Sequence, residues 1–351
     1  MRRSAFGVLL ILGVACGCDD GGDGDAGTDR DAGRRDAGGA TGDAGGGSDG
    51  GGASDGGSDA GVDAGPSGPN VDVSDPQLYT IDFSPTDADA MSADGDQTQI
   101  GHLDTRVTPR GLLVVYLHGA NRPATCGSRA HSQVIASFGY HVINPCYDSD
   151  YGIGNCTDRV GDCRLEAFEG VDHHPFLDTA PADSLERRIA RGLAYLDAQN
   201  PEGDWSYFLA DADTPAWDRI IISGISHGAS TAALIGKVRD VARVVSLSGP
   251  NDNGQSWITM TGITPIDRYW SFTHTTDGQH PAILGSQMDL GMVGDPTDVD
   301  GASPPYGGSH RLHSSAATTD GHTSTQAGGA SPRTGGEYDF LPVWQTMYGA
   351  D

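Results

Sequence analysis

The chain of 351 residues is organised around one stretch, which reads Ile220-Ile-Ile-Ser-Gly-Ile-Ser-His-Gly-Ala-Ser-Thr-Ala-Ala-Leu-Ile235. Its first six residues are mostly β-branched and apolar, which predicts a buried strand. Its second half is rich in alanine and other small residues, which predicts a helix. Between the two lies Gly224-x-Ser226-x-Gly228. A sharp turn here would hold the serine in a strained backbone conformation, and a side chain at either glycine would collide with the neighbouring strand or helix.

The five-residue pattern alone is weak evidence, because glycine occupies 53 of the 351 positions. The same pattern occurs twice earlier in the chain, around Ser48 and around Ser54. Only the match at Ser226 follows a β-branched run and opens an apolar helix, which is the context of a nucleophile elbow. The alternative is a glycine-flanked serine in an ordinary strand-to-helix turn.

The N-terminus predicts export. Two arginines follow Met1, and residues 6–14 form an apolar run that is too short to span a bilayer permanently. Small residues lead into Cys16-Gly-Cys18, which is typical of a lipoprotein signal whose cysteine thiol is acylated. We expect Cys18 to carry the lipid, because hydrophilic sequence begins directly after it, and Cys16 is the alternative. Residues 1–18 are therefore predicted to be a lipoprotein-type signal peptide, although an ordinary cleaved signal without lipid is also compatible.

Residues 19–70 consist almost wholly of Gly, Asp, Ala and Ser. Such a segment cannot bury enough apolar surface to offset its ordering entropy, so we expect a disordered linker. A coil of about 50 residues spans on the order of 40 Å, which would hold a folded domain clear of a membrane. The predicted location is the cell envelope, facing the periplasm or the cell surface, or the medium after secretion, with membrane contact only through the N-terminal lipid.

The acidic character of the chain disfavours some kinds of ligand. The linker holds twelve aspartates and three arginines, so 9 of the 27 net negative charges lie in it. Calcium binding there is disfavoured because the Asp-x-Asp-x-Asp-Gly spacing with a closing glutamate is missing. The acidic surplus of the whole chain argues against a nucleic-acid partner, which would require a basic face.

Residues 71–351 are predicted to form one α/β domain. Four cysteines remain in it, and in an exported protein an even number favours two disulfides, with three connectivities open. A zinc site is disfavoured because no Cys-x-x-Cys pair is present. The four residues are Cys126, Cys146, Cys156 and Cys163.

Hydrophobic patterning predicts strands that alternate with helices over this domain. The strands are expected at residues 78–83, 112–117, 140–144, 220–225, 242–247, 268–274 and 309–314, the helices at 128–138, 183–199, 226–235 and 282–292. Residues 147–182 are expected to be irregular. This order predicts a doubly wound, mostly parallel sheet with its ligand site at the carboxyl ends of the strands.

Two motifs carry a resemblance to a known family. They are Leu113-Val-Val-Tyr-Leu-His118-Gly119 and Ile222-Ser-Gly-Ile-Ser226-His-Gly228. Over roughly residues 75–340 the chain resembles the α/β-hydrolase superfamily, and within it secreted bacterial esterase-like lipoproteins. The resemblance implies the α/β-hydrolase fold, an ester substrate and no cofactor or metal.

The resemblance also implies a catalytic triad in the order Ser, acid, His. Ser226 would be the nucleophile, which needs a base because a free hydroxyl is a poor nucleophile at neutral pH. His322 is the expected base, since it lies on a glycine-bearing loop beyond the last predicted strand. His310 and His313, within or beside that strand, are the alternatives.

Asp277 is the expected acid, which would fix the tautomer of the histidine and stabilise its charged form. Asp252, after the preceding strand, is the runner-up, and Asp289 and Asp295 are later candidates. Each of these could instead be an ordinary surface or turn aspartate in a chain this rich in Asp.

Two backbone N–H groups should meet the negative oxygen of the tetrahedral intermediate. Position within the family motifs gives the N–H of His227, directly after the serine, and that of Ala120, directly after His118-Gly119. His173 and His174, beside Asp172, could pass for metal ligands, but adjacent loop histidines are more often solvated.

The connection over residues 249–267 is short, which predicts that no large cap domain covers the site. An uncapped site would be open and suited to polymer chain ends or to bulky esters, so the expected partner is an ester substrate, either a small molecule or a polymer chain. Trp257, Met260 and Ile263 could form an apolar lip of the site or pack into the core, and residues 146–180 could form another wall. The expected function is a serine hydrolase of carboxylic esters; a non-catalytic binding lipoprotein, or an acyltransferase or peptidase with the same triad, are the alternatives.

Overall fold

The computed structural model describes residues 68–351 except residue 158. The predicted signal peptide, the lipidation candidates Cys16 and Cys18 and nearly all of the predicted linker lie outside the described residues, so these features and the domain boundaries drawn from them stay predictions. Within the part of the chain that the structure describes, no helix combines the length and apolar character needed to cross a membrane.

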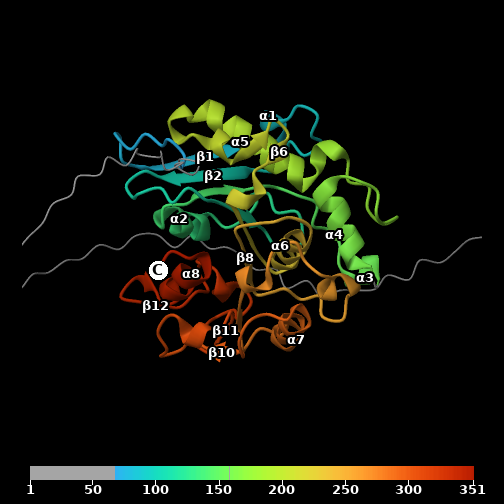
Figure 1. Ribbon diagram of the computed structural model, residues 1–351, viewed down its shortest axis with the longest axis vertical. Coiled ribbons are helices and arrows are strands. Elements are labelled where there is room, and N and C mark those ends of the chain that lie inside the picture. Colours follow the sequence, from blue (N-terminus) through green and yellow to red (C-terminus); the bar gives the residue numbers. More distant parts are fainter. Residues whose placement is uncertain (1–67, 158) are drawn as a thin grey trace, which may run out of the picture. The chain divides into compact units, whose positions relative to one another are not determined.

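The core of the fold is a nine-stranded sheet (Figure 1). Eight strands run in one direction, and β2 runs against its neighbours. In sheet order the strands are β1 (Leu78–Phe83), β2 (Gln99–Asp104), β4 (His141–Asn144), β3 (Leu113–Leu117), β7 (Ile220–Ile225), β8 (Arg243–Leu247), β9 (Tyr269–His274), β11 (Arg311–Ser314) and β10 (Thr297–Asp298). The predicted α/β, doubly wound and mostly parallel sheet is confirmed.

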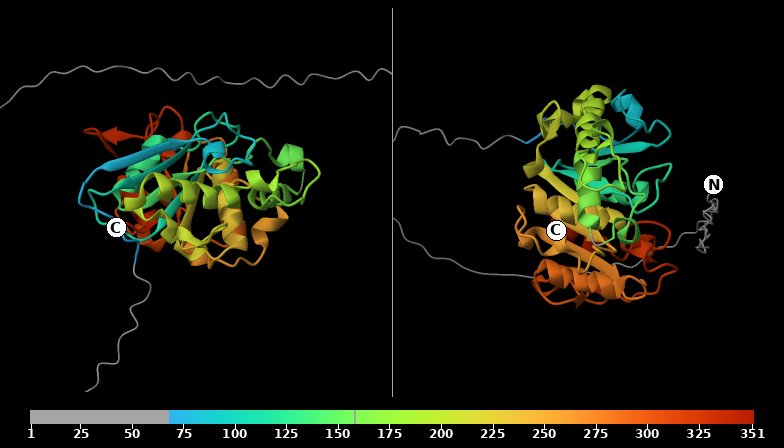
Figure 2. Two further views of the ribbon diagram at one scale, coloured as in Figure 1. Left: turned by 90° about the horizontal axis from the view of Figure 1, so that it is seen from above. Right: turned by 90° about the vertical axis from the view of Figure 1, so that its right-hand side faces the viewer.

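Helices cover both faces of this sheet (Figures 1 and 2). One core cluster contains residues of α4 (Val160–Glu169), α5 (Leu185–Gln199) and α6 (His227–Val238); the other contains residues of α2 (Arg129–Ser137) and α8 (Leu341–Tyr348). β3 shows why both cores form, because alternate strand side chains point to opposite faces. Its Leu113, Val115 and Leu117 enter the first cluster, while Val114 and Tyr116 enter the second.

The remaining helices and strands lie outside the nine-stranded sheet. They comprise α1 (Pro85–Ala88), α3 (Ile153–Cys156), α7 (His280–Leu290) and two hairpins, β5 (Leu209–Asp211) with β6 (Thr214–Pro215) and β12 (Arg333–Thr334) with β13 (Glu337–Tyr338). Short 3-10 turns lie between them. The helix expected at 282–292 begins two residues earlier, at His280, with Pro281 in its first turn, where a missing N–H does no harm.

Several elements were not predicted, and one prediction was wrong. The pattern gave no indication of α1, β2, β10, α8 or the two hairpins. Residues 147–182, expected to be irregular, contain α3 and α4. α4 was missed because Arg164 and Glu166 interrupt its apolar residues, although both are buried and bonded inside the protein.

The two predicted disulfides are present, and the structure selects one of the three possible connectivities. Cys126 bonds Cys146, and Cys156 bonds Cys163. The first bond ties the segment before α2 to the end of β4, and the second ties α3 to α4. Both therefore hold local loops near the carboxyl ends of β3 and β4.

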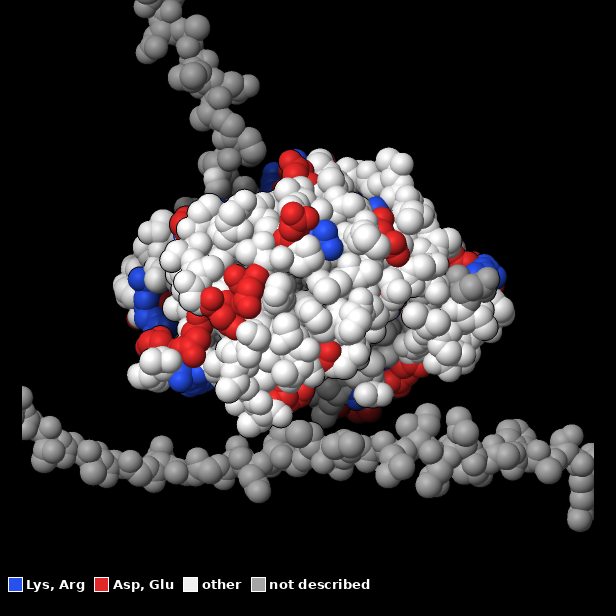
Figure 3. Space-filling model, turned by 90° about the horizontal axis from the view of Figure 1, so that it is seen from below, with Lys and Arg blue, Asp and Glu red and all other residues white. Residues whose placement is uncertain are grey.

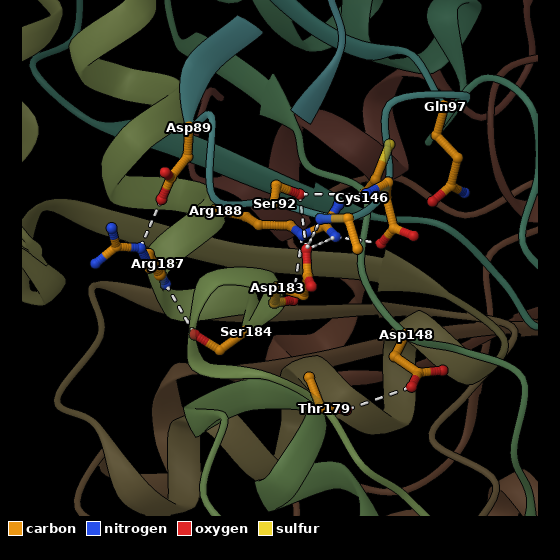
Figure 4. Close-up of polar contacts among 12 residues, drawn as sticks. Asp89, Ser92, Gln97, Cys146, Asp148, Thr179, Asp183, Ser184, Arg187 and Arg188 are labelled. Atoms are coloured by element: carbon orange, nitrogen blue, oxygen red, sulfur yellow. Dashed lines mark hydrogen bonds and ion pairs between the residues drawn. The ribbon is translucent and has the colours of Figure 1, made fainter. Parts of the chain in front are cut away.

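The start of α5 is fixed by polar contacts (Figure 4). The hydroxyl of Ser184 accepts the N–H of Arg187 and caps the helix. The carboxylate of Asp183 accepts hydrogen bonds from Ser92 Oγ at 2.7 Å and from Arg188 Nη2 at 2.8 Å. These contacts fasten the segment between β1 and β2 to α5. On the face shown in Figure 3, carboxylate side chains predominate over basic ones, as the net charge of −27 would suggest.

Candidate active site

The turn between β7 and α6 has the geometry of a strained elbow. Ser226 caps α6 with φ 57° and ψ −118°, a left-handed conformation that non-glycine residues rarely adopt. A Cβ at Gly224 would lie 2.6 Å from the carbonyl carbon of Gly228, and one at Gly228 would lie 2.4 Å from the oxygen of Leu117. The steric reason predicted for the two glycines is confirmed. The serine thus lies at the carboxyl end of a central strand.

The structure brings His322 and Asp277 together. His322 lies on the loop after β11, and Asp277 lies just past β9. The Nδ1–H of His322 donates to Asp277 Oδ2 at 2.8 Å. The two loops approach so closely that a Cβ at Gly321 would lie 2.4 Å from Thr276 Oγ1, which explains the glycine before the histidine.

Asp277 is held in its charged form. Burial raises the pKa of its carboxyl, but the hydrogen bonds from His322 and from the N–H of Gln279 outweigh burial and bring the pKa below its ordinary value. The carboxylate is 6% exposed. It is therefore an ionised acceptor that fixes an N–H on Nδ1 of His322.

Ser226 and His322 line one cavity of about 340 Å³. No hydrogen bond joins the serine hydroxyl to the imidazole in residues 68–351, and such bonds are often absent until substrate is bound. Ala120 borders the same cavity. The N–H groups of Ala120 and His227 have no acceptor within the described part of the chain, so both are available to a ligand oxygen.

One residue beneath His322 had no place in the sequence interpretation. Ser248 follows β8, is fully buried and has φ 44°. Its Oγ donates to the carbonyl oxygen of His322 at 2.6 Å and lies 2.9 Å from Thr325 Oγ1. The only sequence signal was a polar residue before Gly249-Pro250 at the end of a buried strand. Ser248 holds the histidine loop against the sheet.

Asp252, the runner-up acid, is occupied elsewhere. It accepts Arg164 Nε at 2.8 Å and Nη2 at 3.0 Å, together with Trp257 Nε1 at 3.0 Å. Arg164 also donates to the carbonyl oxygen of His227. The buried ion pair fastens α4 to the loop after β8, and the bond to His227 fastens α4 to the first turn of α6. No hydrogen bond joins Asp252 to His322 among the described residues. Arg164 was missed because the sequence offered no pattern around it.

The other candidates lie apart from Ser226. His310 precedes β11 and stacks on Trp270 with ring centroids 3.7 Å apart, and His313 lies beside His280. Asp289 accepts the N–H of Gly254, and Asp295 lies exposed before β10. None of these four lines a cavity that contains Ser226 in the described part of the structure.

The side chain of His227 is buried behind the elbow. Its Nδ1 donates to Tyr147 OH at 3.0 Å, because the Tyr147 hydroxyl itself donates to the carbonyl oxygen of His118. Burial, with Arg164 and His118 nearby, brings the pKa of His227 well below its ordinary value. The His118 imidazole is buried as well, and its Nδ1 bonds the carbonyl oxygen of Gly119.

Only some of the residues that were expected to form the walls of the site do so. Trp257 is buried in the core, and Ile263 and Met260 lie beside Lys237, at the far end of α6 from Ser226. They form no lip of the site. Tyr151 and Ile153 do line a cavity with Ser226, so the cysteine-bearing segment is a wall, as expected. The connection over 249–267 carries only 3-10 turns, which agrees with the prediction of no large cap domain.

One group of described side chains comes together as metal ligands might. The ligand atoms of Cys156, Cys163 and His174 lie within 4.8 Å of one another. The two sulfurs are joined in a disulfide and therefore offer no thiolate. His174 is buried, and the backbone N–H groups of His173 and His174 both donate to Glu166. These two histidines are therefore not simply solvated.

The arrangement of these parts identifies the fold. A serine at a strained strand-to-helix turn, an N–H after the neighbouring β3, and an acid and a histidine from later loops follow the chain order Ser226, Asp277, His322. These are the structural features of the α/β-hydrolase fold.

Comparison with known proteins found similarity only among solved structures. Neither a protein-family model nor a curated protein sequence matches the chain. Esterase B from Lactobacillus rhamnosis is 14% identical over 68% of this chain and 74% of its own, with a TM-score of 0.35. S-formylglutathione hydrolase from Staphylococcus aureus is 14% identical over 68% and 92%, with a TM-score of 0.36. A feruloyl esterase module from Clostridium thermocellum is 13% identical over 70% and 82%, with a TM-score of 0.38.

Proposed function

We propose that this chain, whose fold is that of the α/β hydrolases, is a serine hydrolase that cleaves carboxylic esters. The observation that carries the proposal is the pairing of His322 with a buried, ionised Asp277. His322 also shares a cavity with Ser226, whose backbone is strained. An ordinary turn serine needs none of these three features.

In the first half of the reaction, Ser226 Oγ attacks the ester carbonyl while Nε2 of His322 takes the hydroxyl proton. Asp277 stabilises the imidazolium that forms, because its carboxylate is already ionised and bonded to Nδ1. The imidazolium then gives its proton to the departing alcohol oxygen. An acyl-enzyme on Ser226 remains.

In the second half, water takes the place of the alcohol. His322 removes a proton from the water as it attacks the acyl carbonyl, and returns that proton to Oγ as the acid leaves. The chain's own residues and water account for every proton in both halves. No cofactor takes part in this proposal.

The oxyanion of each tetrahedral intermediate would be bound by the free N–H groups of His227 and Ala120. Both residues border a cavity with Ser226. One such donor typically stabilises the transition state by about 2.7–4 kcal/mol. Neither N–H group has an acceptor among the described residues, which supports their assignment as the oxyanion-binding donors.

The test is hydrolysis of a panel of p-nitrophenyl esters by the full-length protein. Ser226→Ala should lower the rate by about a million-fold, to the background that binding alone supplies. Ser54→Ala is the matched control, because Ser54 lies in the same Gly-x-Ser-x-Gly pattern within the linker. Activity that survives Ser226→Ala would refute the proposal. Binding of an ester without turnover by the wild type would favour the binding lipoprotein.

Acyl transfer and peptide cleavage use the same acyl-enzyme, and differ in the acceptor or the leaving group. Product analysis with added alcohols, and a peptide library, would separate them from ester hydrolysis. We further propose export to the cell envelope with a lipid on Cys18, which mass analysis of the mature N-terminal peptide would test.

A further inference from the structure

Two cavities meet at Ser226. The first, of about 340 Å³, is lined by His322, Thr323 and Gln326. The second, of about 220 Å³, lies on the side of Tyr151, Arg164 and Asp252. Ser226 and Ala120 border both. The reacting carbonyl would therefore sit on the ridge between the two, with one half of the ester on each side.

The proton transfer decides which half lies where. The departing alcohol oxygen must receive its proton from His322, so it lies in the cavity that His322 lines. The acyl group then enters the second cavity. This assignment rests on the proposed function, because it requires His322 to be the general acid.

The second cavity is small. Its volume of about 220 Å³ lies below the roughly 300–1,000 Å³ of sites for drug-sized ligands. The cavity can enclose a short acyl group but not a long one.

Burial distinguishes the rim of this cavity from its floor. Ile153 is 44% exposed and Ala120 is exposed, so these two form the rim. Arg164, Ser230 and Asp252 are 3%, 1% and 2% exposed, so they form the floor. The floor is polar, and the half-buried amides of Asn251 and Gln279 line the same cavity.

The floor keeps unused hydrogen-bonding capacity. Arg164 uses four of its five N–H groups, on Asp252, His227 and Thr231, and one N–H on Nη2 remains. Asp252 Oδ1 accepts only one bond. Ser230 Oγ accepts the N–H of Asn251, and its own proton has no acceptor within residues 68–351. The floor thus offers both donors and an acceptor.

We propose that the second cavity selects a short acyl group that carries a hydroxyl. A hydroxyl both donates and accepts, as this floor requires. A carboxylate would face Asp252, and an ammonium would face Arg164, so neither charged group is accommodated. A plain alkyl chain would leave these unused donors and this acceptor without a partner, whereas a hydroxyl gains hydrogen bonds from them.

The test compares p-nitrophenyl 3-hydroxybutyrate with p-nitrophenyl 3-methylbutyrate, in which a methyl replaces the hydroxyl. Each kcat/KM of the full-length protein is divided by the rate of hydroxide-catalysed hydrolysis of the same ester, which removes the difference in intrinsic reactivity. The expected ratio favours the hydroxyl by at least about tenfold, or about 1.4 kcal/mol. p-Nitrophenyl decanoate should be cleaved at least tenfold more slowly than unsubstituted p-nitrophenyl butyrate.

Ser230→Ala removes one donor from the floor, and should bring the hydroxyl-to-methyl ratio to within about threefold of one. A wild-type ratio near one, with hydrolysis that still depends on Ser226, would overturn the acyl assignment and leave the ester hydrolase intact. Rapid cleavage of the decanoate would do the same. Absence of any Ser226-dependent hydrolysis would overturn both proposals.

Discussion

Asp277 and Asp252 each follow a strand at the same edge of the sheet, and their partners distinguish them. Asp277 accepts the imidazole N–H of His322, whereas Asp252 accepts a guanidinium in two bonds. The first carboxylate can therefore fix the tautomer of an imidazole, whereas the second holds α4 against the loop after β8. Sequence alone could not separate them, because both have the same position relative to a strand.

Replacement of each aspartate by asparagine should give opposite results. Asp277→Asn should lower kcat by about 10⁴-fold with little loss of stability, because the amide favours the wrong tautomer of His322. Asp252→Asn should instead lower the free energy of unfolding by about 3–5 kcal/mol, since Arg164 is left buried and unpaired. Steady-state kinetics and urea unfolding of both variants check this. A larger kcat loss in the Asp252 variant, at equal folding, would reverse the assignment.

Ser248 predicts a positioning effect at the residue scale. Ser248→Ala removes the hydroxyl that binds the His322 carbonyl, a bond worth about 1–2 kcal/mol, so kcat should fall about tenfold while KM stays constant. Ser248→Thr should recover part of the rate because it restores a hydroxyl.

The matched control is Ser246→Ala, whose hydroxyl is equally buried but donates to the carbonyl of Ala229. It should leave kcat unchanged. An equal fall of kcat in both variants would show a general loosening of β8, and would remove the positioning role of Ser248.

At the scale of elements, the local sequence pattern predicted the strands that are continuous apolar runs and the helices that have one apolar face. β7 and α5 are examples. β2 escaped because Gln-Ile-Gly-His-Leu-Asp is half polar, yet all six residues are buried. Its polar side chains find partners that only the folded chain supplies, such as the Cys146 N–H on Gln99 Oε1. Gly101 leaves room for Leu196, since a Cβ there would lie 2.5 Å from it.

The elbow between β7 and α6 predicts a steric effect. Gly228→Ala places a Cβ 2.4 Å from the Leu117 carbonyl oxygen and 2.5 Å from that of His118. These are backbone atoms that cannot rotate away, so we expect a large loss of stability or failure to fold. Gly154→Ala, with nothing within 4 Å of its new Cβ, is the control and should melt within about 2 °C of the wild type. Equal melting temperatures of both variants would contradict the packing described for the elbow.

At the scale of the whole molecule, the sequence predicted the sheet class, the number of disulfides and the loops that carry the candidate triad. It could not predict which loops meet. His322 pairs with Asp277, and Arg164 pairs with Asp252, across long stretches of the chain. The disulfide connectivity is one of three that the sequence allows equally. Such contacts depend on tertiary packing, which no local periodicity records.

Buried histidines make the whole fold sensitive to acid. Burial lowers the pKa of His102, His118 and His141 to about 4 and that of His131 to about 3. In the unfolded chain these groups take up protons near pH 6.5, so between pH 6.5 and 4 the unfolded state binds more protons than the folded state.

Stability should therefore fall as pH decreases through this window, by up to about 1.4 kcal/mol per pH unit for each of these histidines. Urea unfolding at pH 7, 6 and 5 measures it. Aspartates with lowered pKa lose their contribution only below about pH 4, so they do not account for a loss in this window. A free energy of unfolding that stays constant or rises from pH 7 to 5 would show that these imidazoles are not buried in neutral form.

The central claim is that Ser226 is an activated nucleophile. The most direct measurement is labelling of the full-length protein with a fluorophosphonate, followed by peptide mass mapping, with Ser226→Ala and His322→Ala variants in parallel. We expect one adduct, on Ser226, that is absent from the first variant and at least a hundredfold slower to form in the second. No adduct on the folded wild-type protein, or an adduct on another serine, would contradict it.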